Sequence, residues 1–152
     1  MLFRSLKALR TVFPPPLLLT SALPAPQSML QHFPLAQAIA ELDLIFLMAY
    51  DFSGPWTELS GHHAQLLARK GSGTDSAAVS GAGAVAFLTS NGVPASKIVL
   101  GIPIYGRYFP GAGSVDRPYT KPTSEEDATI EYSKLPQRGA MEWVDKIGRA
   151  HV

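Results

Sequence analysis

The stretch from Asp43 to Tyr50 constrains the fold most, because it is an almost continuous apolar run that ends at the polar residue Asp51. Strands of this kind are typical of parallel sheets, where both faces are covered, whereas a strand with one wet face alternates apolar and polar residues. Two further apolar runs, Leu17–Leu23 and Ile98–Ile104, predict two more buried strands. We therefore expect an α/β fold with a parallel sheet.

Stretches with helical spacing separate the predicted strands. An amphipathic helix is expected from residue 2 to Pro14, a second over Leu30–Ile39, and an Ala-rich third over Ala77–Leu88, closed by Asn91-Gly92. Alternating strands and helices are typical of parallel βα units. A closed barrel needs eight such units, and three leave two apolar edges unpaired. The sequence thus predicts part of a larger barrel.

The pattern changes beyond Tyr105, where glycine, proline and charged residues replace the apolar runs. Thr129–Tyr132 is consistent with a short strand and Met141–Asp145 with a short helix. We expect a small inserted domain to begin in this part of the chain.

Composition excludes several classes of function. The 13 basic and 12 acidic residues are spread along the chain and give a net charge of +1, so no basic surface for nucleic acid is predicted. Cysteine is absent, which excludes disulfides and thiolate metal sites. No apolar run approaches the roughly 20 residues of a membrane span. Residues 1–25 imitate a signal peptide, but Pro14, Pro15 and Pro16 interrupt the apolar part, so a signal is not predicted.

Polar and aromatic residues follow two of the predicted strands. Tyr50, Asp51 and Trp56 come after one strand, and Tyr105 and Arg107 come after the next. In parallel βα folds, side chains at the carboxyl ends of strands meet ligands. An aromatic face can pack on a sugar ring while carboxylate, phenol and guanidinium groups bind its hydroxyls and amides. These residues are candidates for a carbohydrate site.

Simpler interpretations stand beside this one. Met48 is more often a core residue than a ligand contact, and Asp51 could be only a turn residue at a strand end. His62-His63 could suggest a metal site, but adjacent side chains diverge and no carboxylate has convincing spacing, so a hydrogen-bonded loop is favoured. No metal and no cofactor are predicted.

The order of the motifs resembles that of fungal-type chitinases of glycoside hydrolase family 18. Leu42–Phe52, with Met48-Ala49-Tyr50-Asp51 and the following Gly54-Pro55-Trp56, is similar to the sixth barrel strand, and Gly61–Leu66 to the loop behind it. Lys97–Arg107, with Ile102-Pro103-Ile104-Tyr105-Gly106-Arg107, resembles the seventh strand, and Leu17–Ala25 the fifth. The resemblance implies part of a (β/α)8 barrel.

The resemblance also divides the chain. Residues 1–108 are expected to be a partial family 18 barrel, and residues 109–146 to begin the α+β insertion that many such chitinases carry. The end, Ile147-Gly148-Arg149-Ala150-His151-Val152, departs from the pattern. One coding for it, ATC GGA AGA GCA CAC GTC, matches a widely used sequencing adapter. We therefore expect an assembly artefact at residues 147–152.

The family's mechanism is substrate-assisted and retaining. A glutamic acid protonates the glycosidic oxygen while the acetamido oxygen of the substrate attacks the anomeric carbon. That glutamate closes an Asp-x-x-Asp-x-Asp-x-Glu run, which this sequence lacks; Glu125-Glu126-Asp127 is expected to be a solvated loop instead.

The resemblance also suggests roles for the residues that are present. Tyr50 would bind the acetamido group, with Asp51 near sugar hydroxyls and Met48 packing below. Tyr105 and Arg107 would line the adjoining cleft, and Trp56 would stack on a sugar.

The resulting hypothesis is a fragment of a chitinase that hydrolyses β-1,4 bonds between N-acetylglucosamine units, inactive by itself because its general acid is missing. The alternative is a non-catalytic protein that binds chitin or chito-oligosaccharides. The resemblance implies that the whole protein acts outside the cell or at the cell wall. The sequence leaves open the oligomeric state and whether a whole protein cuts internally or from chain ends.

Overall fold

The fold is described by a computed structural model that covers residues 2–69 and 78–139. One half of the elongated molecule contains a three-stranded parallel sheet, formed by β1 (Thr20–Pro24), β2 (Leu44–Met48) and β3 (Ile98–Leu100) in the order β1-β2-β3. Leu23 pairs with Leu47 and Leu47 with Leu100, so the register is continuous across the sheet. The predicted parallel α/β sheet is confirmed.

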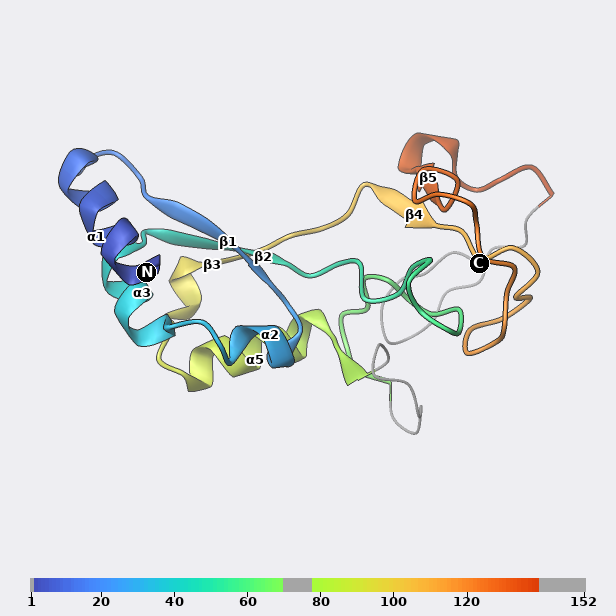
Figure 1. Ribbon diagram of the computed structural model, residues 1–152, viewed down its shortest axis with the longest axis horizontal. Helices are drawn as coiled ribbons and strands as arrows, with labels where there is room; N and C mark the ends of the chain where they lie inside the picture. Colours follow the sequence, from blue (N-terminus) through green and yellow to red (C-terminus); the bar gives the residue numbers. More distant parts are fainter. Residues whose placement is uncertain (1, 70–77, 140–152) are drawn as a thin grey trace.

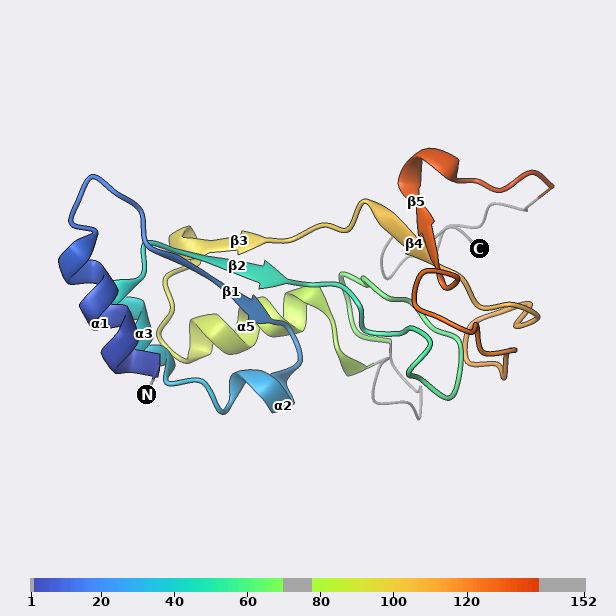
Figure 2. The same ribbon diagram turned by 45° about the horizontal axis from the view of Figure 1, so that its top comes forward.

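Helices cover one face of this sheet. The helices are α1 (Leu2–Val12), α2 (Gln27–Leu30), α3 (Leu35–Glu41) and α5 (Gly81–Ser90), with the 3-10 turn η1 (Ala95–Lys97) leading into β3. Figures 1 and 2 show α2 and α5 on the same side of the sheet, with α1 and α3 packed together beside the amino ends of its strands. Ser80 caps α5 by accepting the backbone N–H of Gly83.

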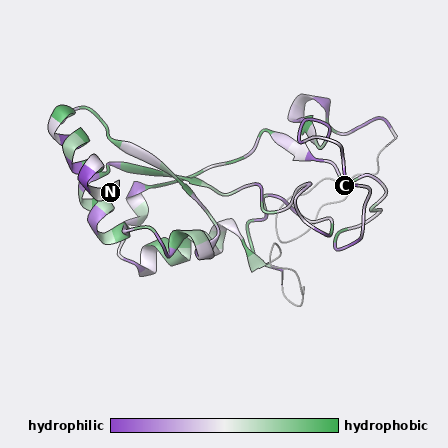
Figure 3. Cartoon of the chain, viewed as in Figure 1, coloured by the Kyte–Doolittle hydropathy of each residue, from purple (hydrophilic) through white to green (hydrophobic). Residues whose placement is uncertain are grey.

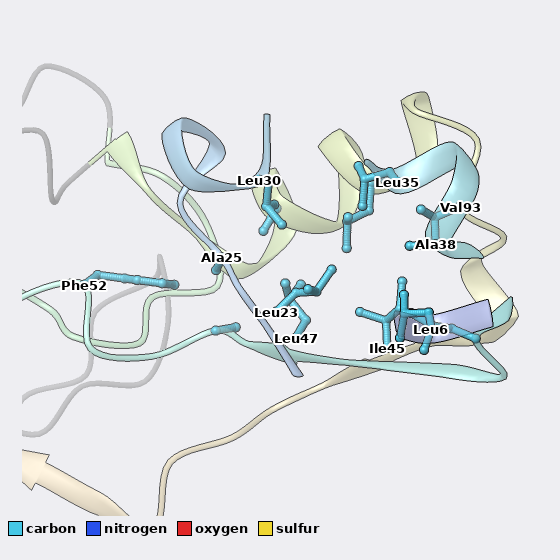
Figure 4. Packing of buried hydrophobic residues seen from close by; sticks show 14 residues of the cluster. Leu6, Leu23, Ala25, Leu30, Leu35, Ala38, Ile45, Leu47, Phe52 and Val93 are labelled. Carbon is cyan, nitrogen blue, oxygen red and sulfur yellow. The ribbon is translucent and has the colours of Figure 1, made fainter. Parts of the chain in front are cut away.

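The hydrophobic core lies between the covered face and the helices. Leu23, Ile45 and Leu47 point from the strands toward Leu30 and Leu35 of the helices, as Figure 4 shows. Alternate residues of a strand face opposite sides, so Ile45, Leu47 and Ala49 are buried together. Burial of this apolar area is the main stabilising contribution in this half.

The other face of the sheet is open in the described part of the chain. Phe46 is 43% exposed and Val99 37% exposed, although both lie within strands. Farther along, Ile102 and Ile104 are 80% and 81% exposed. The prediction that these strands are buried on both faces is therefore wrong for the structure of this chain, because the described helices cover only one of them.

Several predicted boundaries also shift. The first strand begins at Thr20, and Leu17 and Leu18 lie exposed between the proline turn and this strand. The predicted helix Leu30–Ile39 is divided into α2 and α3, with the break at Phe33-Pro34. Proline lacks the N–H that a continuous helix needs there. The short helix predicted at Met141–Asp145 lies outside the described residues.

A second, two-stranded antiparallel sheet lies in the other half of the molecule. It pairs β4 (Tyr105–Arg107) with β5 (Thr129–Glu131), followed by the turn η2 (Tyr132–Lys134). The apolar run Ile98–Ile104 thus forms a strand only over β3, and the chain then leaves the first sheet to enter the second (Figure 2). The short strand predicted near Thr129 is confirmed.

Polar contacts fix the end of the sheet opposite this second half. The Asp43 carboxylate accepts the guanidinium of Arg10 and, at 2.7 Å, the backbone N–H of Leu19. These bonds hold the pKa of Asp43 below its ordinary value, the Arg10 hydrogen bond contributing most. Lys97 donates to the backbone carbonyls of Ile39 and Leu42 at 2.9 and 2.6 Å.

None of the helices in residues 2–69 and 78–139 combines the length and apolarity that crossing a membrane requires.

Candidate carbohydrate site

The site begins where the chain leaves the carboxyl end of β2. Asp51 has a φ of 60°, in the left-handed region that aspartate tolerates better than most residues. This turn takes the chain from strand to loop, and the loop is closed where the backbone N–H of Phe52 donates to the carbonyl of His63 at 2.9 Å. The turn at Asp51 therefore lies between the end of β2 and the loop half of the molecule, and the Asp51 side chain faces β4.

An ion pair joins the two predicted clusters. Arg107 on β4 donates through Nε and Nη2 to Asp51 Oδ1, at 2.9 and 2.7 Å. Its Nη1 donates to the hydroxyl of Thr129 on β5 at 2.8 Å, and the Arg107 side chain is only 8% exposed. A guanidinium held at both ends has little freedom to rotate, so Arg107 links the β2 end to the second sheet.

Aromatic rings surround this ion pair. The guanidinium carbon of Arg107 lies 4.9 Å from the ring centre of Trp56 and 5.2 Å from that of Tyr105. Tyr50 meets Tyr105 edge to face, with ring centres 6.3 Å apart. Burial, and then the hydrogen bond with Asp51, raise the pKa of Tyr105, so its phenol keeps its proton. The group is thus rich in aromatic faces and hydrogen-bonding groups.

Five of the six predicted site residues are therefore brought together, namely Tyr50, Asp51, Trp56, Tyr105 and Arg107. Met48, the sixth, ends β2 opposite Pro24 and is half-buried. The ion-pair and ring contacts of the cluster do not include it.

His63 belongs to this cluster and was not predicted as a site residue. Its ring centre lies 5.2 Å from that of Tyr105, and its Nδ1 lies 3.8 Å from Asp51 Oδ1. Burial lowers the pKa of His63, although the Asp51 carboxylate acts in the opposite direction. In the described part of the chain, no group of three or more histidine, aspartate or glutamate side chains could hold a metal ion. The sequence favoured a hydrogen-bonded loop at His62-His63, and the structure places the His63 ring of that loop beside Asp51.

An open depression adjoins the ion pair. It is lined by Tyr105, Arg107, Glu125, Glu126 and Thr129. Glu125 and Glu126 are exposed, as the predicted solvated loop requires, but their position beside Arg107 could not be read from the sequence. The depression lies where the loop before β5 turns toward β4.

Comparison with known proteins assigns the chain to a family. The family model of glycosyl hydrolases family 18 matches residues 2–150. The chain belongs to this family. It is 39% identical over 112 residues to endochitinase 1 of Metarhizium robertsii, covering 72% of this chain and 26% of the relative. It is 37% identical over 125 residues to chitinase 1 of Aphanocladium album, covering 81% of this chain and 29% of that protein.

A solved family 18 structure is also similar in fold. A class V chitinase mutant from Nicotiana tobaccum, determined in complex with NAG4, superposes with a TM-score of 0.78 and 26% identity. The match covers 96% of this chain and 47% of that one. The chain thus spans less than a third of the length of the two curated relatives and about half of the solved domain.

Proposed function

We propose that this chain supplies one wall of the sugar-binding cleft of a family 18 chitinase, which hydrolyses β-1,4 bonds between N-acetylglucosamine units. The observation that carries the proposal is the cluster in which Arg107 is bound to Asp51 and lies near Trp56 and Tyr105. It combines ring faces with fixed donors and acceptors, which is what an amphipathic, amide-bearing sugar requires. The Nicotiana relative was solved with NAG4 bound, which supports this ligand class.

The contacts support the roles that the family resemblance suggests for these residues. Arg107 fixes the Asp51 carboxylate through Oδ1, and the Asp51 side chain, which is 35% exposed, would accept a sugar hydroxyl. Tyr50, with its ring edge on Tyr105, would donate to the acetamido oxygen and steady it for attack. Trp56 is 46% exposed and offers its ring to a neighbouring sugar, while Met48 would pack below.

We assign β1, β2 and β3 to the fifth, sixth and seventh strands of a (β/α)8 barrel. The parallel order β1-β2-β3 and the helices on one face support this assignment. The open face with Phe46 and Val99 would then point to the barrel interior. The insertion would begin at residue 109, and the β4–β5 pairing would join it to the barrel part at residues 1–108. Residues 147–152, which lie outside the described residues, remain a proposed artefact.

The general acid would be supplied by residues that this sequence does not contain. No Asp-x-x-Asp-x-Asp-x-Glu run is present, and the Asp51 carboxylate already accepts two N–H groups from Arg107. Without the acid the leaving oxygen departs as an alkoxide, a loss typically of about 10²–10⁴-fold in rate. We therefore propose that this chain alone does not hydrolyse chitin. The alternative, a non-catalytic protein that binds chito-oligosaccharides, would use the same aromatic rings and fixed hydrogen-bonding groups without any acid.

The proposed place of action is outside the cell or at the cell wall. Chitin is an insoluble polymer, so an enzyme or a binding protein must meet it where it is deposited. The names of the Metarhizium and Aphanocladium relatives, an endochitinase and a chitinase, support the polymer as substrate.

Calorimetric titration of this chain with tetra-N-acetylchitotetraose tests the binding proposal. Cellotetraose, which has the same linkage but hydroxyls in place of acetamido groups, is the matched control. We expect saturable heat with the first sugar and little with the second. Equal binding of both sugars, or of neither, would contradict an acetamido-reading site. Release of shorter sugars from chitotetraose by this chain would contradict the missing acid.

A further inference from the structure

The turn that carries Trp56 is held by a second loop. Residues 54–57 form a tight turn, in which the backbone N–H and the hydroxyl of Thr57 donate to the Gly54 carbonyl at 2.9 and 2.8 Å. A Cβ built on Gly54 would lie 2.5 Å from the nearest indole atom of Trp56, so this ring rests directly on the Gly54 backbone. The indole orientation therefore depends on the shape of the turn beneath it.

Tyr119 contacts both ends of that turn. Its hydroxyl lies 2.8 Å from the carbonyl oxygen of Thr57 and 3.0 Å from that of Gly54, and donates a hydrogen bond shared between them. The ring of Tyr119 is fixed in turn by Phe109, edge to face with centres 5.0 Å apart. Tyr119 is half-buried and comes from a loop more than 60 residues away in sequence.

A second group of bonds joins the same two loops. Ser60 is 4% exposed, and its hydroxyl donates to the Ser114 carbonyl at 2.7 Å and accepts the Arg117 N–H at 3.1 Å. Its backbone N–H donates to the Arg117 carbonyl, and its carbonyl accepts the Asp116 N–H, both at 2.9 Å. These bonds hold residues 114–117 against Ser60, so the segment that leads to Tyr119 is tied to the loop that follows the turn.

We infer that Tyr119 is a positioning residue that sets the orientation of Trp56 through the 54–57 turn, and thereby the affinity of the cleft for chito-oligosaccharides. The inference rests on the proposed function, because Trp56 is a proposed sugar contact. Tyr119 itself touches only the two carbonyls of the turn and Phe109 among the contacts described. Its effect on sugar must therefore pass through Trp56.

Tryptophan fluorescence separates this role from sugar binding. The chain has two tryptophans, and changing Trp143→Phe leaves Trp56 as the one reporter. In that background we compare Tyr119→Phe, which removes only the hydroxyl, and Ser60→Ala, which loosens the supporting loop. Tyr132→Phe is the matched control, because Tyr132 is 63% exposed and lies outside both loops.

We expect acrylamide to quench Trp56 more strongly in Tyr119→Phe and Ser60→Ala than in the parent, with Tyr132→Phe unchanged. Chitotetraose affinity should fall about fivefold in Tyr119→Phe, the usual effect of losing one hydrogen bond. Unchanged quenching in both test variants would overturn the inference. A parent that binds no sugar would overturn the proposed function instead, while the quenching comparison would still decide the role of Tyr119.

Discussion

Different interactions stabilise the two halves of the molecule: apolar burial in one, and ion pairs and hydrogen bonds in the other. The buried apolar residues lie almost entirely in the sheet-and-helix half, with Phe52 and Ala128 as the exceptions among the described residues. In Figure 3 the hydrophobic colour follows the strands and helices, whereas the loop half is mostly polar. That second half contains the Asp51–Arg107 ion pair and the hydrogen bonds of Ser60 and Tyr119.

The two kinds of interaction have different consequences for the stability of the fold and for the orientation of side chains. Apolar burial is non-directional and proportional to area, so it stabilises the sheet without fixing fine detail. Hydrogen bonds and ion pairs are directional and contribute less each, but they decide where a side chain points. Substitutions in the first half should therefore change mainly the free energy of unfolding, and substitutions of the directional contacts in the second half should change mainly sugar affinity.

The largest expected effect on stability is at Leu47, which is fully buried in the centre of the sheet. Leu47→Ala should lower the free energy of unfolding by about 2–5 kcal/mol, because it leaves a cavity among well-packed neighbours. Urea denaturation followed by circular dichroism measures this loss. Phe46→Ala is the control on the adjacent, open-face position and should cost much less. Equal losses would break the contrast between the covered and open faces.

A smaller effect, this time on binding, is expected at Arg107. Arg107→Lys keeps the charge but loses the paired N–H donors to Asp51 Oδ1, as well as the planar group near Trp56. Charge-assisted hydrogen bonds contribute about 1.5–3 kcal/mol, so chitotetraose affinity should fall about tenfold or more. Titration calorimetry measures it. Arg117→Lys, whose exposed side chain makes none of these contacts, should bind as the parent does.

The smallest effect concerns His63. Because burial places the folded-state pKa of His63 below its ordinary value near 6.5, the unfolded chain binds the proton more readily. The stability that His63 contributes is therefore present above about pH 6.5 and lost as pH falls through the folded pKa.

His63→Asn should flatten the dependence of unfolding free energy on pH below that point, by at most about 1.4 kcal/mol per pH unit, the slope for one proton. Urea midpoints at a series of pH values from neutral to mildly acidic measure the slope, with His32→Asn as the matched control at an exposed position. A slope that is unchanged in His63→Asn would show that the ring is not buried beside Asp51.

The sequence predicted the parallel sheet because an apolar run such as Asp43–Tyr50 can be recognised from neighbouring residues alone. The same reasoning failed at Ile102 and Ile104, where the apolar run predicted a buried strand. The chain instead leaves the sheet after Leu100, and both isoleucines are exposed. Whether such a residue is covered depends on partners distant in sequence. Pro34, by contrast, carried a local signal for the helix break.

Five residues of the candidate site could be predicted to lie together, because strand ends and the family resemblance both selected them. His63 and Tyr119 could not, because their roles arise from contacts across loops, such as the one between Tyr119 and the Thr57 carbonyl. The adjacent His62-His63 pair suggested a metal or a loop, and nothing local indicated that one of them would lie beside Asp51.

The most direct test of the account is an NMR titration of the ¹⁵N-labelled chain with chitotetraose, following every resolved amide. We predict that the largest shift changes fall on Tyr50, Asp51, Trp56, Tyr105 and Arg107, while core amides such as those of Leu23 and Leu88 stay in place. Changes concentrated on the open sheet face around Phe46 and Val99, or no saturable changes at all, would contradict the assignment of the sugar site.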